Sequence, residues 1–245
     1  ERFTNREERY TGTIQLLGKM LGIPTPERIE SFDISNISGT DIVASMVVFQ
    51  DGKPRKKDYK RFKIRDLDGQ DDYASMHQVI SRRFAHYKNG DPGFETAPSL
   101  LLIDGGVQHA RTARLALAEL GLDFPIFGMV KDDRHRTRAL VTEHGLEIRI
   151  DNQPAIFSLV GNIQEETHRF AITYHRQLRS KRLRYSKLDE IPGVGPKRKA
   201  QLLKMFKSLD AIGRASMYEL EQLLPKPVAA EVYEFFHKED HSQCE

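Results

Sequence analysis

The sequence predicts an α/β fold, a mixed β-sheet flanked by helices, followed by a small all-α domain. Between residues 28 and 64, apolar and polar residues alternate in short stretches, which is typical of strands. From residue 72 onward, stretches with helical spacing of apolar residues separate short apolar runs. Beyond residue 189, glycine and proline separate short helical stretches, as expected for a compact helical domain.

The first part of the sheet is predicted to be an antiparallel meander. Residues 28–35 and 57–64 alternate between apolar and polar side chains, and residues 41–49 are rich in valine and methionine. Asp51-Gly52, which follows the second of these strands, is a signal for a hairpin turn. Three consecutive strands joined by short turns favour antiparallel pairing.

The second part of the domain is predicted to alternate helices with buried strands. The expected elements are a helix over 72–87 capped by Asp71 or Asp72, a strand over 99–103, a helix over 107–120, a strand over 124–130, a hairpin over 134–150 and a helix over 156–182. Three antiparallel strands followed by alternating helix and strand are typical of the ribonuclease H-like fold. In that order the first strand is central and the fourth strand lies beside it.

The length of 245 residues fits one medium domain and one small one. We expect a lead-in segment over 1–27, a ribonuclease H-like domain over 28–182, a basic polar linker over 183–188 and a DNA-binding domain over 189–245. In the lead-in segment, Gly22 and the prolines that follow it end a short helical stretch.

Composition argues against a membrane protein and against a fold held by disulfides. No apolar run approaches the roughly 20 residues that a membrane-spanning helix needs. The single cysteine, Cys244, cannot form an internal disulfide, and no signal peptide is visible, so a cytoplasmic location is expected. The chain begins with Glu1, and we interpret it as a fragment of a longer protein.

The net charge is only +3, but the basic residues are clustered. Residues 169–199 contain ten lysines or arginines and two acidic residues, and residues 53–65 are also rich in lysine and arginine. Such clusters hold backbone phosphates, although solvated faces of helices and strands carry the same pattern.

Three aspartates are candidate catalytic residues. Asp33 lies inside an apolar strand, where a carboxylate is costly unless it is paired, binds a metal or caps a neighbouring turn. Asp104 ends the fourth strand and precedes two glycines, at the edge of the sheet where ligands bind, although it also suits the N-cap of the next helix. Asp72 follows Asp71 at a helix start, where capping is the stronger interpretation.

His168 lies at the edge of the apolar stripe of the long helix, where a side chain can face either a cleft or solvent. In the expected fold this helix crosses over Asp33 and Asp104. A divalent cation would neutralise such clustered carboxylates, and oxygen ligands favour Mg²⁺ or Mn²⁺. The site would align a water for attack on a phosphodiester, with His168 binding the metal or moving a proton and Lys131 neutralising a phosphate.

The most specific local motif is Ile191-Pro-Gly-Val-Gly-Pro-Lys-Arg-Lys199. Gly193 and Gly195 predict a tight turn before a helix, with both glycines in conformations that a Cβ disfavours and their amides facing a phosphate; a plain turn between helices is the alternative. Three basic residues follow and add positive charge: Lys197, Arg198 and Lys199. A matching second position over 224–228 lacks glycine and is expected to pack without gripping phosphate well.

Residues 28–182 resemble the C-terminal endonuclease domain of the UvrC family, the incision subunits of bacterial nucleotide excision repair. The stretches that carry the resemblance are Ile29-Glu-Ser-Phe-Asp-Ile-Ser-Asn36, Asp71-Asp-Tyr-Ala-Ser-Met76, Leu102-Ile-Asp-Gly-Gly106 and Glu166-Thr-His-Arg-Phe-Ala-Ile172. Residues 188–238 resemble the tandem helix-hairpin-helix domain of that family, although the second hairpin lacks the glycines.

The resemblance implies a metal-dependent endonuclease that cuts DNA on the 5′ side of a lesion. It assigns the family's Asp-Asp-His catalytic set to Asp33, Asp104 and His168, and a further functional aspartate to Asp72. The implied partners are DNA, as a damaged duplex, a bubble or an unpaired junction, and the UvrB protein in the full-length context. The expected DNA-binding residues are Gly193, Gly195, Lys197, Arg198, Lys199, Lys131, Arg169 and Arg176.

Two other functions fit parts of the sequence. A ribonuclease H-like scaffold that has lost catalysis would only dock on DNA, and a ribonuclease H or a resolvase would act alone. The complete set of aspartates and histidine argues against the first function. The appended helical domain argues against the second.

Overall fold

The computed structural model describes the backbone of residues 2–37, 41–65 and 71–238, and the side chains of residues 8–35, 42–65, 71–174 and 187–237. Contacts divide the chain into two compact units, Glu1–Thr173 and Tyr174–Glu245. Each unit is described by itself.

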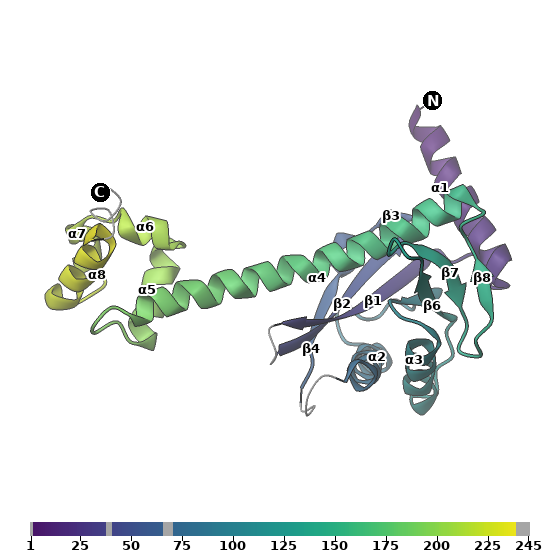
Figure 1. Ribbon diagram of the computed structural model, residues 1–245, viewed down its shortest axis with the longest axis horizontal. Coiled ribbons are helices and arrows are strands. Elements are labelled where there is room, and N and C mark those ends of the chain that lie inside the picture. The colour runs from purple at the N-terminus through teal and green to yellow at the C-terminus, as the bar shows by residue number, and fades with distance from the viewer. Residues whose placement is uncertain (1, 38–40, 66–70, 239–245) are drawn as a thin grey trace. The chain divides into compact units, whose positions relative to one another are not determined.

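Unit 1 is built on a mixed sheet with the strand order β3-β2-β1-β5-β6-β7-β8, in which β4 also pairs with β2 (Figure 1). The strands are β1 (Arg28–Ile37), β2 (Asp41–Gln50), β3 (Lys53–Pro54), β4 (Lys60–Lys63), β5 (Leu100–Ile103), β6 (Ile126–Lys131), β7 (Thr137–Val141) and β8 (Glu147–Arg149). The strands β1, β5 and β6 run parallel, and the remaining pairs are antiparallel. The prediction of a mixed sheet with β1 next to β5 is confirmed.

Helices cover both faces of this sheet. They are α1 (Arg2–Leu21), α2 (Asp72–Asn89), α3 (Val107–Glu119) and α4 (Pro154–Asp189), with a short 3₁₀ turn η1 (Lys56–Asp58). Figure 1 shows α2 and α3 on one face, and α1 with the first part of α4 on the other. The alternation of β1 follows this division, because Phe32 packs with α2 and α3 while Ile29 packs with α1 and α4.

The third predicted strand differs from the structure. Residues 57–64 do not form one continuous strand, because η1 occupies the start of that range and β4 only the end. The carboxylate of Asp58 accepts hydrogen bonds from Arg28 at 2.7 Å and from Arg55 at 3.0 Å. These bonds hold a tight turn in which the Tyr59 amide bonds to the Lys56 carbonyl.

The lead-in segment is part of the fold. Its helix begins at Arg2, well before the expected stretch, and buries Ile14, Leu17 and Leu21 in the same core as Ile29. The spacing of these apolar residues places them on one face of α1. This face covers the apolar surface of the sheet around Ile29.

A buried ion-pair network joins β1 to α2. The carboxylate of Glu30 accepts bonds from Arg83 Nη2 at 2.8 Å and Nε at 3.0 Å, and from Arg28 Nε at 3.1 Å. Arg83 also donates to the carbonyls of Phe94 and Thr96. All three charged side chains are buried, and each has the partners that a buried charge requires.

Unit 2 is helical, as predicted. It contains the end of α4 together with α5 (Pro196–Phe206), α6 (Leu209–Gly213), α7 (Met217–Glu221) and α8 (Lys226–Lys238). The expected linker over 183–188 is helical and belongs to α4, and its last residue, Leu188, is buried in the core of unit 2. None of the described helices combines the length and apolar character needed to cross a bilayer.

Candidate functional site

The two central strands bring Asp33 and Asp104 together. Phe32 on β1 is in register with Ile103 on β5, and the Asp104 amide donates a 2.9 Å hydrogen bond to the Phe32 carbonyl. Side chains alternate along a strand, so Asp33 and Asp104 extend to the face that α4 covers. The predicted pairing of the two carboxylates is therefore present in the fold.

Asp33 is in an environment that opposes its charge. Its side chain is only 7% exposed, and burial raises its pKa to about 6, with a further contribution from the charge of Asp104. A 2.9 Å hydrogen bond from Ser35 and the charges of His168 and Lys131 act in the opposite direction. A pKa that is raised by burial and by a neighbouring carboxylate is common at functional sites of proteins.

Lys131 forms an ion pair with Asp104. Its Nζ lies 2.8 Å from Oδ1 and donates to Oδ2 at 3.0 Å. The register of β6 shifts between Val130 and Lys131, and such a bulge re-aims the side chain that follows it. The buried Oδ1 of Asp104 therefore has the Lys131 ammonium as its partner.

A buried oxygen without a described partner lies on the other side of Asp33. Ser45 on β2 is directly opposite Asp33 in the antiparallel register, so the two side chains share a face. The Ser45 hydroxyl is buried and has no hydrogen-bond partner among the described residues. Buried polar atoms are normally satisfied, which marks this part of the sheet as a place for a ligand or a water.

The helix α4 brings His168 to the same region. The buried hydroxyl of Thr167 lies 3.0 Å from Ser31 Oγ on β1 and 2.7 Å from the Ile163 carbonyl, which fixes this turn of α4 over the sheet. His168 follows Thr167 and is exposed, yet its charge acts on Asp33. The imidazole therefore lies at the edge of the carboxylate pair and is open to solvent.

Asp72 is not the cap of α2. The carboxylate of Asp71 caps the helix by accepting the Ala74 amide at 2.9 Å, so the carboxylate of Asp72 is not needed for that purpose. Asp72 is exposed, and its charge acts on His109, as does that of Asp104. Burial nevertheless lowers the pKa of His109.

His109 is a neighbour of the site that the sequence analysis missed. The signal that could have found it is a histidine in the first turn of the helix after Asp104.

The described residues contain no ready-made group of three His, Cys, Asp or Glu side chains for a metal ion. The oxygen atoms of Asp33 and Asp104 are nevertheless the donors that Mg²⁺ and Mn²⁺ prefer. The raised pKa of Asp33 shows that added positive charge would be favourable at this point. The residues present therefore fit a hard divalent cation, with the carboxylates as its anchor.

Two arginines of α4, Arg169 and Arg176, are predicted to contact DNA, and the structure describes the side chain of Arg169 only. Arg169 is exposed, but its guanidinium donates to both carboxylate oxygens of Glu166, at 2.7 and 2.6 Å. It would have to share or leave this pair to contact DNA. The side chain of Arg176 lies outside the described residues.

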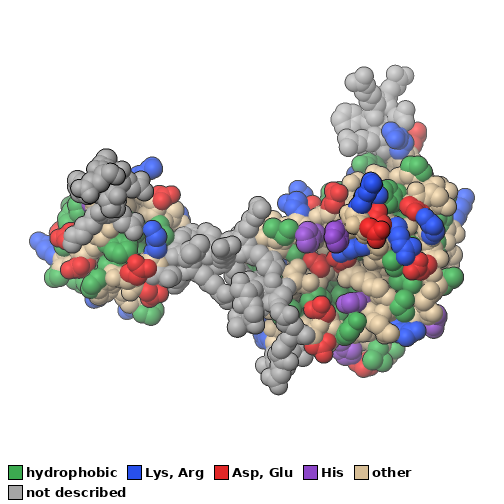
Figure 2. All heavy atoms as spheres, in the orientation of Figure 1, with side chains coloured by type: hydrophobic (Ala, Val, Ile, Leu, Met, Phe, Trp, Pro, Cys, Tyr) green, Lys and Arg blue, Asp and Glu red, His purple; other side chains and the backbone are tan. Residues whose placement is uncertain are grey.

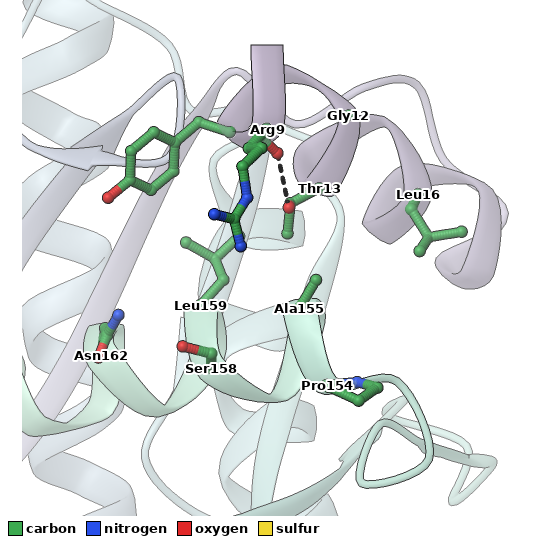
Figure 3. A pocket seen from close by; sticks show the side chains of 10 residues that line it. Arg9, Gly12, Thr13, Leu16, Pro154, Ala155, Ser158, Leu159 and Asn162 are labelled. Carbon is green, nitrogen blue, oxygen red and sulfur yellow. Dashed lines mark hydrogen bonds between the residues drawn. The ribbon is translucent and has the colours of Figure 1, made fainter. Parts of the chain in front are cut away.

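A surface hollow of about 690 Å³ lies away from the carboxylates, between α1 and the start of α4 (Figure 3). Its lining includes Arg9, Thr13, Ser158 and Asn162 but no acidic residue or histidine, so it offers no metal ligands of the predicted kind. On the face of unit 1 visible in Figure 2, basic, acidic and histidine side chains are intermixed.

The hairpin of unit 2 agrees with the prediction for one glycine only. Gly193 has φ +78°, in the region that favours glycine, and an added Cβ would lie 3.1 Å from Val228 Cγ2. The predicted backbone conformation of Gly195 is wrong, because this residue has φ −77° and serves as the extended N-cap of α5. Pro196 can then begin the helix, since its fixed φ suits the first helical position.

The three basic residues after the turn are not equivalent. Lys197 is exposed, whereas Arg198 donates a 2.6 Å hydrogen bond to the Gly193 carbonyl and so closes the turn. Lys199 is buried and ion-paired with Asp189, which overturns its prediction as a DNA contact because a buried, paired ammonium cannot reach a phosphate. The second hairpin leads into α8, and Val228 near the start of α8 lies next to Gly193. This contact is consistent with a packing role for the second hairpin.

Comparisons with known proteins agree with this architecture. The family model of the UvrC RNase H endonuclease domain matches residues 18–172, and a helix-hairpin-helix motif matches residues 190–244. Two similar proteins, each named UvrABC system protein C, come from Desulfitobacterium hafniense (strain Y51) and Streptococcus equi subsp. equi (strain 4047), at 48% and 49% identity.

These alignments cover 94% and 92% of this chain but 38% of each relative, so the chain spans well under half of their length. A crystal structure of Ciona intestinalis endonuclease V in complex with DNA overlaps with 44% of this chain and 47% of its own, at 18% identity and a TM-score of 0.32. An overlap this limited supports no conclusion about function.

Proposed function

Because this chain belongs to the UvrC RNase H endonuclease domain family, we propose that it is a divalent-metal-dependent endonuclease acting on DNA. The single observation that carries the proposal is the carboxylate pair on β1 and β5. Asp33 is buried beside Asp104, and burial together with the charge of Asp104 raises the pKa of Asp33 to about 6. In the whole repair protein, the reaction would be the 5′ incision of bacterial nucleotide excision repair.

The carboxylates would hold Mg²⁺ or Mn²⁺, which when bound activates water and stabilises charge on the phosphodiester. Asp33 supplies a ligand fixed by the strand and by its bond from Ser35. Asp104 would supply a ligand at the end of β5, where its carboxylate is paired with Lys131.

His168 and Lys131 would act around this pair. The exposed imidazole of His168 can reach the cation or accept the proton of the attacking water, because its charge already acts on Asp33. The ammonium of Lys131 forms an ion pair with Asp104 and would lie where a phosphate approaches. Water adds to phosphorus, the bond to the leaving oxygen breaks, and that oxygen takes up a proton.

A docking module without catalysis explains the site less well. Such a module needs basic contacts to phosphate and gains nothing from a buried carboxylate whose pKa is raised. The Ser45 hydroxyl opposite Asp33 also has no hydrogen-bond partner among the described residues. Buried groups of this kind destabilise a fold and persist when they serve a ligand.

The helical unit would bind DNA without reading its sequence. Gly193 allows the tight turn before α5, and the exposed Lys197 adds positive charge next to it. Contacts of this type reach the phosphate backbone, which is the same in every sequence. Interaction with the UvrB protein in the full-length context remains part of the same proposal.

Nicking assays on the 245-residue chain test the proposal. We expect cleavage of bubble DNA with Mn²⁺ or Mg²⁺, none with EDTA, and less cleavage of an RNA–DNA hybrid. Asp33→Asn and Asp104→Asn should abolish nicking and leave DNA affinity close to that of the wild type. Asp123→Asn is a matched control, because this carboxylate is exposed and lies beyond α3.

Several results would contradict the proposal. Nicking at the wild-type rate by either site variant would rule out the carboxylate pair, and cleavage in EDTA would rule out the metal. The side of the cut is tested separately by mapping it on lesion-bearing duplex supplied with the other proteins of the UvrABC system. A cut on the 3′ side would contradict the assigned incision.

A further inference from the structure

An exposed aromatic side chain lies beside the carboxylate site. Tyr73 directly follows Asp72 in the first turn of α2, and its side chain is 48% exposed. Among the side chains that the structure describes in unit 1, it is the one tyrosine or phenylalanine with such large exposure. The other described aromatic rings of this unit are buried or partly buried, so Tyr73 is more open to solvent than they are.

Tyr73 rests on His109. The two ring centroids are 4.7 Å apart and the planes are inclined at 46°, which is a tilted aromatic contact. His109 in turn lies against the backbone of Gly105, where an added Cβ would be only 2.5 Å from its ring. Gly105 immediately follows Asp104, so the chain of contacts runs from the exposed tyrosine to the carboxylate site.

The position of His109 between acidic groups supports this placement. The charges of Asp72 and Asp104 both act on its imidazole. The tyrosine and histidine rings are here called the aromatic shelf, and its histidine lies near both aspartates. A DNA strand with its phosphodiester at Asp104 would carry its neighbouring nucleotides past this shelf.

We propose that the aromatic shelf of Tyr73 and His109 binds an unpaired nucleobase of the DNA strand that is cut. This inference rests on the proposed function. Aromatic side chains bind bases of single-stranded nucleic acid by stacking, and they do so without sequence preference because every base has a π-face. A base inside an intact duplex is covered on both faces by its neighbours, so the shelf selects DNA with an unstacked nucleotide near the cut.

The test measures binding and needs no catalysis. The full chain is titrated in EDTA onto bubble DNA that carries 2-aminopurine in its unpaired stretch, and onto the matching closed duplex. Stacking on Tyr73 should quench the fluorescence, and Tyr73→Ala should remove the quenching and weaken bubble binding by about tenfold. Duplex affinity and the dependence of binding on salt should not change, because no phosphate contact is lost.

Three further variants separate stacking from other roles. Tyr73→Phe keeps the ring and should retain the quenching and the preference for the bubble. His109→Phe should retain them too, whereas His109→Ala should lower both. Tyr218→Ala is the matched control, since this exposed tyrosine lies on α7 in the other unit.

The possible outcomes are distinguishable. Equal affinity of the wild type for bubble and duplex, an equal loss on both with Tyr73→Ala, or a Tyr73→Phe variant as weak as Tyr73→Ala would overturn the shelf. A shelf used by a protein partner would give the first of these results. If quenching is lost only in Tyr73→Ala and His109→Ala while the wild type nicks no DNA, the shelf stands and the proposed nuclease function fails.

Discussion

The carboxylates of Asp33 and Asp104 leave adjacent parallel strands on the same face of the sheet, one residue beyond the Phe32–Ile103 pair. Burial and the charge of Asp104 together raise the pKa of Asp33 to about 6. The fold therefore holds in place a pair of like charges that destabilises it at neutral pH. Catalytic sites commonly contain such an arrangement, because the ligand relieves the repulsion.

The first prediction concerns stability against pH in EDTA. The pKa of Asp33 is about 6 in the folded chain, above the ordinary aspartate value of 3.8, so the folded state binds this proton more tightly. The resulting stabilisation is complete below pH 4 and is lost as pH rises through about 6. From two pKa units we expect a loss of at most ~3 kcal/mol in the free energy of unfolding.

Urea unfolding of the wild type and of Asp33→Asn between pH 4 and pH 7 measures this loss. The asparagine variant lacks the titrating group, so its stability should overtake that of the wild type as pH rises. Parallel curves for the two proteins would show that Asp33 does not titrate in this range.

The second prediction concerns Ser45, whose buried hydroxyl has no partner among the described residues. Removing an unsatisfied hydroxyl relieves a desolvation cost, so Ser45→Ala should keep or raise the free energy of unfolding, by about 1 kcal/mol. Nicking should fall by roughly tenfold, since groups beside a metal site commonly support its affinity or activity to that extent.

Ser75→Ala is the matched control for stability, because the buried Ser75 hydroxyl donates a 2.7 Å bond to the Asp71 carbonyl. This control should lose about 1 kcal/mol. Thermal unfolding and nicking rates on the same preparations give both readouts. A destabilised Ser45→Ala variant with wild-type nicking would assign the hydroxyl a structural role.

The third prediction concerns the buried network that joins β1 to α2. Arg83→Ala leaves Glu30 with Arg28 alone and leaves the carbonyls of Phe94 and Thr96 without their donor. We expect a loss of about 3–5 kcal/mol in the free energy of unfolding, as for other broken buried pairs. Arg82→Ala is the control, because this arginine is only partly buried and donates a hydrogen bond to the carbonyl of Lys63.

Chemical denaturation measures both variants. Folded Arg83→Ala, assayed well below its midpoint, should still nick DNA because the network lies on the face away from Asp33. Equal stability of the two arginine variants would contradict the weight assigned to the network.

Much of the fold could be predicted from the sequence because its signals are local. Alternating residues in β1 and the apolar run of β5 identify strands, and Asp104 at the end of a buried strand identifies a ligand-binding edge. The helix α1 is longer than the short helical stretch that the sequence predicts, although its apolar residues have helical spacing. Residues 183–188 were interpreted as a linker because they are polar, yet lysine, arginine and leucine also favour helix.

The rest depended on neighbours distant in the sequence. Lys199 is buried and ion-paired with Asp189, which no charge pattern reveals. Ser45 matters only because the register of β2 places it opposite Asp33. The contact between His109 and Tyr73 joins two different helices, and a residue count along either helix cannot identify it.

The last prediction uses the two glycines of the hairpin as a matched pair. Gly193→Ala should destabilise unit 2 and weaken DNA binding, because its φ of +78° disfavours a Cβ and Val228 Cγ2 would lie 3.1 Å away. Gly195→Ala should fold normally, because its φ is −77° and no described atom lies within 4 Å of an added Cβ. Any loss of DNA affinity in Gly195→Ala therefore reports close approach of the DNA backbone to this residue.

Lys197→Ala should lower the salt dependence of DNA binding by about one phosphate contact, a slope change of about 0.9. Affinity measured over a salt series, with thermal unfolding of each variant, separates folding from contact. Wild-type affinity and slope in all three variants would show that the hairpin packs the domain without holding DNA.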